Sequence, residues 1–205
     1  MTRFILTLAL ALFCALPAQA DTSVVRLLKT EADGLKGLSK SRVEWLMKGH
    51  AGTRVSYTDD FLSGLPKARG GQEWKCLAEA LYFEARGETV KGQFAVAEVI
   101  LNRVDSARFP DTVCGVVNQG TGRKHACQFS YTCDGRAETI AEPKAYERVA
   151  KVAKLMLAGA PRQLTDGATY YHTSGVKPKW SRKFARTTTI GVHQFYRPGQ
   201  KLASN

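Results

Sequence analysis

The sequence lacks the patterns that mark several common protein classes. After its first 20 residues, the chain of 205 residues has no hydrophobic run near the ~20 apolar residues that a membrane helix needs. It has four histidines and no CxxC or HxxxH spacing of the kind that binds zinc. It has no internal repeat, no low-complexity tract and no Lys/Arg-rich block interleaved with aromatic residues. These absences argue against an integral membrane protein, a zinc module, a repeat protein and a nucleic-acid-binding module.

The first 20 residues are typical of a secretory signal peptide. Arg3 supplies a positive start, residues 4–16 form an apolar core, and Ala18-Gln19-Ala20 resembles a cleavage site. We therefore expect export across the inner membrane, a mature chain from Asp21, and a periplasmic location in a Gram-negative cell without stable membrane insertion. The alternative is that this segment stays as an N-terminal anchor.

The chain carries a strong positive charge, formally +12 at pH 7. Net charge indicates partners rather than fold. In an exported protein the abundant polyanions belong to the cell envelope, so we expect an anionic wall as the partner and no nucleic acid. We expect no cofactor.

Four of the five cysteines lie outside the signal segment, and an even number in an exported chain favours two disulfides among three possible pairings. The short spacing of Cys127 and Cys133 predicts a local bridge between them, which leaves Cys76 to pair with Cys114. The alternative is zinc, because His125 lies close to Cys127, but no standard zinc spacing accompanies it. We expect no metal site.

Residues 73–104 predict two helices separated by a glycine turn. In the first, Leu77, Ala80, Leu81 and Glu84 share one face, and three of these four positions are apolar. A glutamate on a core-facing stripe is desolvated, which raises its pKa and keeps it protonated, as a general acid requires. The alternative is that the carboxyl lies in solvent at the rim or pairs with Arg86.

The turn between these helices carries two further expectations. Gly87 is placed to end the first helix in a left-handed cap. Glu88 follows at the start of the second helix, where its charge suits the positive end of the helix dipole.

The rest of the chain gives a helix, two strands and two irregular regions. Residues 21–70 have poor periodicity and read as an extension and linker. Residues 109–138 read as a long loop, residues 143–158 as a third helix, and residues 168–172 and 187–197 as strands. The expected units are a signal peptide (1–20), an extension or linker (21–70), a main domain (71–198) and a tail (199–205).

Polar and aromatic residues in the loop and the strands are candidates for holding sugar rings, which stack on aromatic faces and accept hydrogen bonds at their rims. The alternative is that each has only a structural role. The candidates are Glu88 after the glycine turn, Gln128, Phe129 and Ser130 in the loop, and Tyr170, Tyr171, His172, Trp180 and His193 further on.

Several strings resemble the cell-wall hydrolases of the spore-cortex-lytic type, the SleB/CwlJ family. They are YFEARGE (82–88), GQFAVA (92–97), VILNRV (99–104), CQFS (127–130), ATYYHT (168–173), PKW (178–180) and IGVHQFY (190–196). The resemblance runs collinearly over about residues 73–197. It implies a lysozyme-like α+β fold with a small antiparallel sheet, an enzyme that cuts peptidoglycan glycan strands, and Glu84 as its catalytic acid.

Cleavage of a glycosidic bond requires a proton for the leaving oxygen and usually a second carboxylate. No clear companion to Glu84 appears, and Asp111, Asp134, Glu138 and Asp166 have no assigned place. A muramic acid residue can supply its own C6 hydroxyl instead, and the product is then a 1,6-anhydro sugar. We therefore expect a lytic transglycosylase that cuts between N-acetylmuramic acid and N-acetylglucosamine. The alternatives are a metal-dependent N-acetylmuramoyl-L-alanine amidase using His172 and His193, a non-catalytic wall-binding protein, and a basic DNA-binding protein.

Overall fold

The computed structural model describes residue 29, residues 55–123 and residues 127–199. The chain divides into two units, residues 1–38 and 39–205, and everything below concerns the second. The expected signal peptide, most of the expected extension and nearly all of the expected tail lie outside the described residues. Within the described ranges, no helix is long and apolar enough to cross a membrane.

Helices α4 (Gln72–Ala85) and α5 (Val90–Val104) form the predicted helical pair. Thr89 caps α5, because its side chain accepts a hydrogen bond from the Gly92 N–H at 3.2 Å. The expected left-handed cap at Gly87 is wrong. Arg86 keeps right-handed φ and ψ angles at the end of α4, and the φ angle of Gly87 is not positive. The chain therefore turns tightly, and the Glu88 N–H donates to the Ala85 carbonyl at 3.0 Å.

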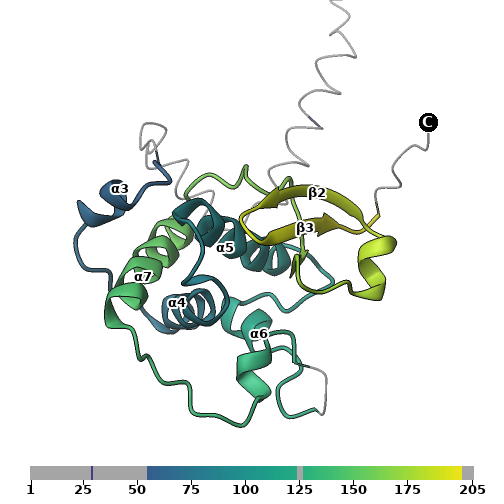
Figure 1. Ribbon diagram of the computed structural model, residues 1–205, viewed down its shortest axis with the longest axis horizontal. Helices are drawn as coiled ribbons and strands as arrows, with labels where there is room; N and C mark the ends of the chain where they lie inside the picture. The colour runs from purple at the N-terminus through teal and green to yellow at the C-terminus, as the bar shows by residue number, and fades with distance from the viewer. Residues whose placement is uncertain (1–28, 30–54, 124–126, 200–205) are drawn as a thin grey trace, which may run out of the picture. The chain divides into compact units, whose positions relative to one another are not determined.

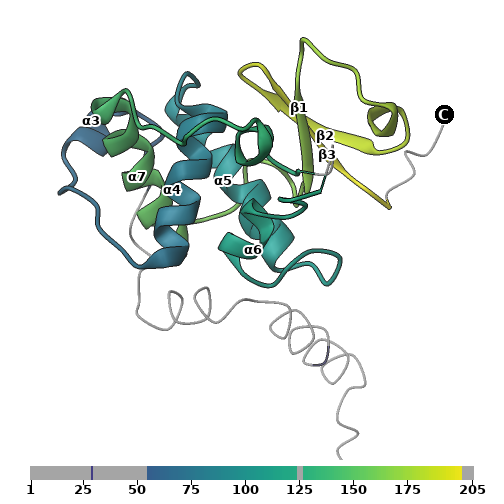
Figure 2. The same cartoon turned by 90° about the horizontal axis from the view of Figure 1, so that it is seen from below.

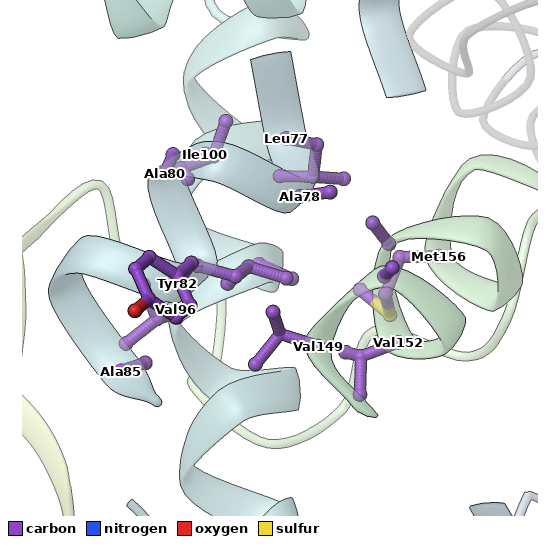
Figure 3. Close-up of a cluster of buried hydrophobic side chains, with 14 of the residues drawn as sticks. Leu77, Ala78, Ala80, Tyr82, Ala85, Val96, Ile100, Val149, Val152 and Met156 are labelled. Carbon is purple, nitrogen blue, oxygen red and sulfur yellow. The ribbon is translucent and has the colours of Figure 1, made fainter. Parts of the chain in front are cut away.

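Helix α7 (Pro143–Leu157) is the third predicted helix, with Pro143 in its first turn and Gly159, at a φ of 94°, just after its end. Its apolar stripe packs against α4, as Figure 3 shows for Leu77, Val149, Val152 and Met156. Leu77 and Val149 are fully buried. This packing fixes the axis of α4, the helix that carries Glu84.

Residues 55–70 do not form a linker, which corrects the expected boundary at residue 71. Helix α3 (Asp59–Ser63) places Leu62 in the core with 2% of its surface exposed. The buried Lys151 ammonium donates to the Leu62 carbonyl at 3.0 Å, and Tyr57 meets Phe94 edge to face. A helix of five residues is too short to show a clear periodicity, so the sequence pattern did not reveal it.

The region expected as a loop, residues 109–138, contains two short helices, α6 (Val113–Val117) and the 3₁₀ helix η2 (Ser130–Cys133). The Glu73 carboxylate accepts from the Val113 N–H at 2.6 Å, at the positive end of α6. Both predicted disulfides are present. Cys76–Cys114 ties α4 to α6, and Cys127–Cys133 closes the chain around η2.

Three strands form an antiparallel sheet in the order β1 (Tyr170–Thr173), β3 (His193–Arg197), β2 (Ala185–Ile190). The single strand expected over residues 187–197 is therefore a hairpin. Its turn lies at Gly191, whose φ of 59° suits glycine. The 3₁₀ helix η3 (Lys179–Arg182) carries Trp180 in the connection between β1 and β2.

The sheet packs on α5, which lies between α4 and the strands in Figure 2. Ile190 and Phe195 meet Ala95 and Val99 of α5 in a second, smaller core. Figure 1 shows the same order of α4, α5 and sheet from another side. The α+β class with a small antiparallel sheet and two disulfides is as expected.

Candidate active site

Glu84 lies in the last turn of α4 and is half-buried. Its Oε2 accepts a hydrogen bond from the Tyr171 hydroxyl at 3.1 Å. Burial raises the pKa of Glu84 above its ordinary value, while the Tyr171 hydrogen bond and the Arg103 charge act in the opposite direction. The raised pKa favours the protonated carboxyl, and the two opposing groups stabilise the carboxylate that remains after the proton leaves.

Tyr171 reaches Glu84 because the chain before β1 is anchored to α5. The buried Glu98 carboxylate accepts from the Leu164 and Thr165 N–H groups at 3.0 and 2.9 Å. Asn102 donates to the Ala168 carbonyl at 3.0 Å. Burial, together with the Glu84 charge, places the pKa of Tyr171 well above its ordinary value, so its hydroxyl keeps its proton and donates.

Arg103 of α5 is a residue close to the site that the sequence pattern did not single out, although it stands inside the VILNRV string. Only 1% of its surface is exposed. Its Nε donates to the Thr169 carbonyl at 2.7 Å. Its guanidinium lies 5.4 Å from the ring centre of Phe109, 5.6 Å from that of Phe129 and 5.7 Å from that of Tyr170.

The disulfide-closed segment 127–133 borders this group. When the Gln128 side-chain oxygen faces Arg103, it accepts from both terminal guanidinium nitrogens at 3.3 Å. Tyr131 stacks on Phe83, the neighbour of Glu84, with ring centres 4.5 Å apart. Burial and the charges of Glu79, Glu84 and Glu138 raise the pKa of Tyr131. The segment thus connects Arg103 with the end of α4.

Glu88 contacts His193 rather than standing free at the start of α5. Its Oε1 lies 3.7 Å from Nδ1 of His193, and only 3% of the His193 side chain is exposed. The Glu88 carboxylate fits against two glycines, since a Cβ at Gly191 would lie 2.0 Å from Oε2 and one at Gly92 would lie 3.0 Å from it. His193 also meets the Tyr171 ring edge to face at 5.1 Å.

His193 is held neutral by its surroundings. Burial lowers the pKa of His193, Glu88 opposes that shift, and His172 adds to it. Its Nδ1 has no hydrogen-bond partner among the described residues. Glu88 and His193 therefore lie close together without a hydrogen bond between them.

The other predicted sugar-binding residues do not all converge on Glu84. Side chains alternate along a strand, so Tyr170 and His172 lie on the face of the sheet opposite to Tyr171. There His172 stacks on Tyr196 and bonds its hydroxyl at 3.0 Å, and Trp180 contacts Tyr170 and His172. Tyr170 nevertheless contacts Arg103, which interacts with Glu84. Ser130 is exposed, and Phe129 is buried in the core.

The four unassigned carboxylates take different places. Asp111 lines a cavity of about 350 Å³ between α5, α6 and α7. Asp134 accepts from the Arg136 N–H at 2.9 Å, and Asp166 pairs with Arg197 at 3.4 Å. The Glu138 charge, like that of Glu84, adds to the burial that raises the pKa of Tyr131.

The histidines proposed for a metal-dependent amidase do not share a site. His172 and His193 occupy opposite faces of the sheet, because His172 pairs with Gln194 and His193 with Thr173 in the β1–β3 register. Within the described ranges, no cluster of three His, Cys, Asp or Glu side chains is arranged to hold a metal ion.

Comparison with known proteins gives one family match. The Cell Wall Hydrolase model matches residues 87–196, which begins three residues after Glu84. Spore cortex-lytic enzymes are among the curated relatives that it resembles. The Bacillus cereus enzyme is 49% identical over 133 residues, which is 65% of this chain and 47% of the relative. The enzyme of Halalkalibacterium halodurans is 33% identical over 136 residues, or 65% of this chain and 37% of the relative. The chain thus spans less than half the length of these relatives.

Two solved structures are also similar. The catalytic domain of the germination-specific lytic transglycosylase SleB from Bacillus anthracis is 31% identical, with 65% of this chain and all of that chain covered and a TM-score of 0.45. The catalytic domain of the Bacillus cereus SleB protein is 32% identical, with 65% and 98% covered and a TM-score of 0.45.

Proposed function

The chain belongs to the cell wall hydrolase family, and from this membership we propose that it cleaves peptidoglycan glycan strands as a lytic transglycosylase. The bond cut is the one between N-acetylmuramic acid and N-acetylglucosamine, and Glu84 is the general acid and base. The spore cortex-lytic relatives support the same substrate class. The observation that carries the proposal is the half-buried Glu84 carboxyl with its raised pKa and its Tyr171 hydrogen bond.

In the first step Glu84 acts as an acid. Its proton passes to the glycosidic oxygen, the bond from that oxygen to C1 of the muramic acid breaks, and the electron pair stays with the leaving oxygen. An oxocarbenium-like centre develops at C1. The Tyr171 hydroxyl and the Arg103 guanidinium then stabilise the Glu84 carboxylate that is left.

In the second step Glu84 acts as a base. The C6 hydroxyl of the same muramic acid residue attacks C1 while its proton returns to the Glu84 carboxylate. The products are a 1,6-anhydro sugar end and a free N-acetylglucosamine end, with Glu84 protonated again. No second protein carboxylate is required, so Glu88 can serve as a partner of His193 instead.

The proposal extends to the location and to the domain boundaries. Residues 1–20 have the pattern of a secretory signal, and the net charge of +12 suits an anionic wall. The catalytic domain includes residues 55–70, because α3 and its neighbours contribute to its core. The periplasm is the compartment in which an exported enzyme with two disulfides meets peptidoglycan.

The test is mass spectrometry of muropeptides after digestion of purified sacculi with the wild-type protein. Lytic transglycosylase action gives 1,6-anhydro-muramic acid ends, and a hydrolase gives reducing ends in their place. Release of free peptides with intact glycan strands would identify the amidase alternative. A wall-binding protein would pellet with the sacculi and release nothing.

A further inference from the structure

Arg103 is a buried cation that pays a desolvation cost. Burial of a charge is unfavourable unless the charge is paired and hydrogen-bonded. Its hydrogen-bond acceptors, the Thr169 carbonyl and the Gln128 side-chain oxygen when that oxygen faces it, are neutral. Among the described residues, the one carboxylate that helps to keep Arg103 charged against this burial is Glu84. Glu84 therefore stabilises the positive charge of Arg103 when the Glu84 carboxyl is ionised.

The contacts of Arg103 reach two segments that border Glu84. Through Thr169 and Tyr170 it holds the two residues that directly precede Tyr171, the hydrogen-bond donor to Glu84. Through Gln128 and Phe129 it holds the disulfide-closed segment that places Tyr131 against Phe83. The rings of Phe109, Phe129 and Tyr170 surround the guanidinium, with their centres 5.4, 5.6 and 5.7 Å from it.

We propose that Arg103 is a positioning residue for Glu84, which fixes the Glu84–Tyr171 pair and supplies the permanent positive charge that the Glu84 carboxylate needs when it acts as a base. The catalytic part of this inference, in which Glu84 acts as a base, rests on the proposed function. The coupling between the two side chains is a property of the free protein and can be measured without substrate.

The groups that face Glu84 give the sign of the expected effect. Arg103 of α5 and the hydroxyl of Tyr171 in β1 both lower the pKa of Glu84, and burial raises it. Tyr131 of η2 also interacts with Glu84, and it faces Glu79 and Glu138 in turn. Removal of the Arg103 charge takes away one of the two groups that lower the pKa of Glu84. Burial then raises this pKa further.

The experiment compares Arg103→Met and Arg103→Gln, which are neutral, with Arg103→Lys, which keeps the charge. Arg197→Met is the matched control, because this arginine lies in β3 and pairs with Asp166. Two readouts are taken: the rate of glycan release from sacculi against pH, and the titration of the Glu84 carboxyl by ¹³C NMR, assigned with Glu84→Gln.

In the neutral variants we expect kcat to fall at least tenfold. Their high-pH limb and NMR titration should both move upward by about one pH unit, as expected for loss of one nearby opposite charge. Arg103→Lys and Arg197→Met should titrate as the wild type does. A purely structural role predicts a lower rate at every pH with no displacement of the limb, and that result would overturn the proposal. It is also overturned if Arg103→Lys moves the limb as far as Arg103→Met.

Should both neutral variants fail to fold, Gln128→Glu provides the test with Arg103 in place. The new carboxylate takes the position of the Gln128 oxygen and offsets the guanidinium charge, so the Glu84 titration should again move to higher pH. An unmoved titration in a folded Gln128→Glu protein rejects the proposal. If wild-type digests lack anhydro ends while the titrations shift as expected, the reaction assignment fails and the coupling of Arg103 to Glu84 stands.

Discussion

The Tyr171 hydroxyl of β1 donates a hydrogen bond to Oε2 of Glu84 in α4 across 87 positions of sequence, at 3.1 Å. The two side chains are brought together by α5, which packs on α4 on one side and on the sheet on the other. Burial raises the pKa of both groups, and the Glu84 charge raises that of Tyr171 further, whereas the Tyr171 hydrogen bond and the Arg103 charge lower the pKa of Glu84. This hydrogen bond therefore couples the packing of the helices to the protonation state of Glu84, the candidate acid.

Replacement of Glu84 by Gln should abolish most of the activity. Gln keeps the shape but cannot donate a proton to a glycosidic oxygen, and general acid–base catalysis contributes ~10²–10⁴-fold. The measurement is the initial rate of glycan release from sacculi, with circular dichroism to check folding. Full activity in a folded Glu84→Gln protein would show that the chemistry does not use this helix.

The same variant should change the pH dependence of stability. The pKa of Glu84 is raised in the folded state, so the stability that this group contributes is fully present below the ordinary glutamate pKa and is lost as pH rises through the folded value. Glu84→Gln cannot ionise and should lack that decline, which makes it the more stable protein at neutral pH. Urea unfolding at acidic and neutral pH measures the difference.

Replacement of Tyr171 by Phe should weaken the acid–base cycle without removing it. Loss of the hydroxyl takes away a group that stabilises the Glu84 carboxylate, so the pKa of Glu84 rises and the high-pH limb of activity moves upward. Tyr146→Phe, on α7, is the control and should leave the profile unchanged. An identical pH profile for Tyr171→Phe and wild type would mean that the hydrogen bond has no catalytic weight.

The helical part of the site was predictable because its signals are local. The apolar positions of α4 recur at helical spacing, so Glu84 could be placed on the core side before any contact was known. Both disulfides were predictable because compartment and spacing left one favoured pairing. In each case the deciding information was either the spacing of residues within a few helical turns or the number and spacing of the cysteines.

Arg103 and α3 were not predictable in the same way. An arginine in the last turn of a helix reads as a surface cation, and its burial is created by rings at positions 109, 129 and 170, which the fold alone brings together. The opposite faces of Tyr171 and His172 follow from strand register. The position of β1 against α5, which decides which face meets Glu84, depends on contacts distant in sequence.

Removal of residues up to 68 should destabilise the domain, contrary to the expectation from sequence. Such a truncation deletes Leu62 and Tyr57 from the core. Leu62→Ala alone should cost about 2–5 kcal/mol in the free energy of unfolding, as for other buried leucines. Ser63→Ala, on the exposed side of α3, is the control. If a chain that starts at residue 69 melts at the same temperature as one that starts at residue 55, α3 makes no contribution to the fold.

His193 should make the protein sensitive to acid. Its pKa is lowered in the folded state, so the stability it contributes is present above the ordinary histidine pKa of about 6.5. That stability is lost as pH falls below this value toward the folded pKa. His193→Gln should flatten the dependence between neutral pH and the folded pKa, measured by thermal unfolding in a pH series. A wild-type melting temperature that is constant through this window would contradict the expected linkage.

The two disulfides should fail in different ways when each is replaced by a pair of serines. Cys76–Cys114 spans 38 residues and Cys127–Cys133 spans six. By loop-closure entropy, the first should contribute about 4 kcal/mol to stability and the second about 2 kcal/mol.

The smaller bridge, however, closes the segment that carries Gln128, Phe129 and Tyr131 against Arg103 and Phe83. Cys127→Ser/Cys133→Ser should therefore lose more activity per unit of lost stability than Cys76→Ser/Cys114→Ser, when both are assayed well below their melting temperatures. Equal activity losses at matched folded fractions would show that the 127–133 bridge serves only to stabilise the fold.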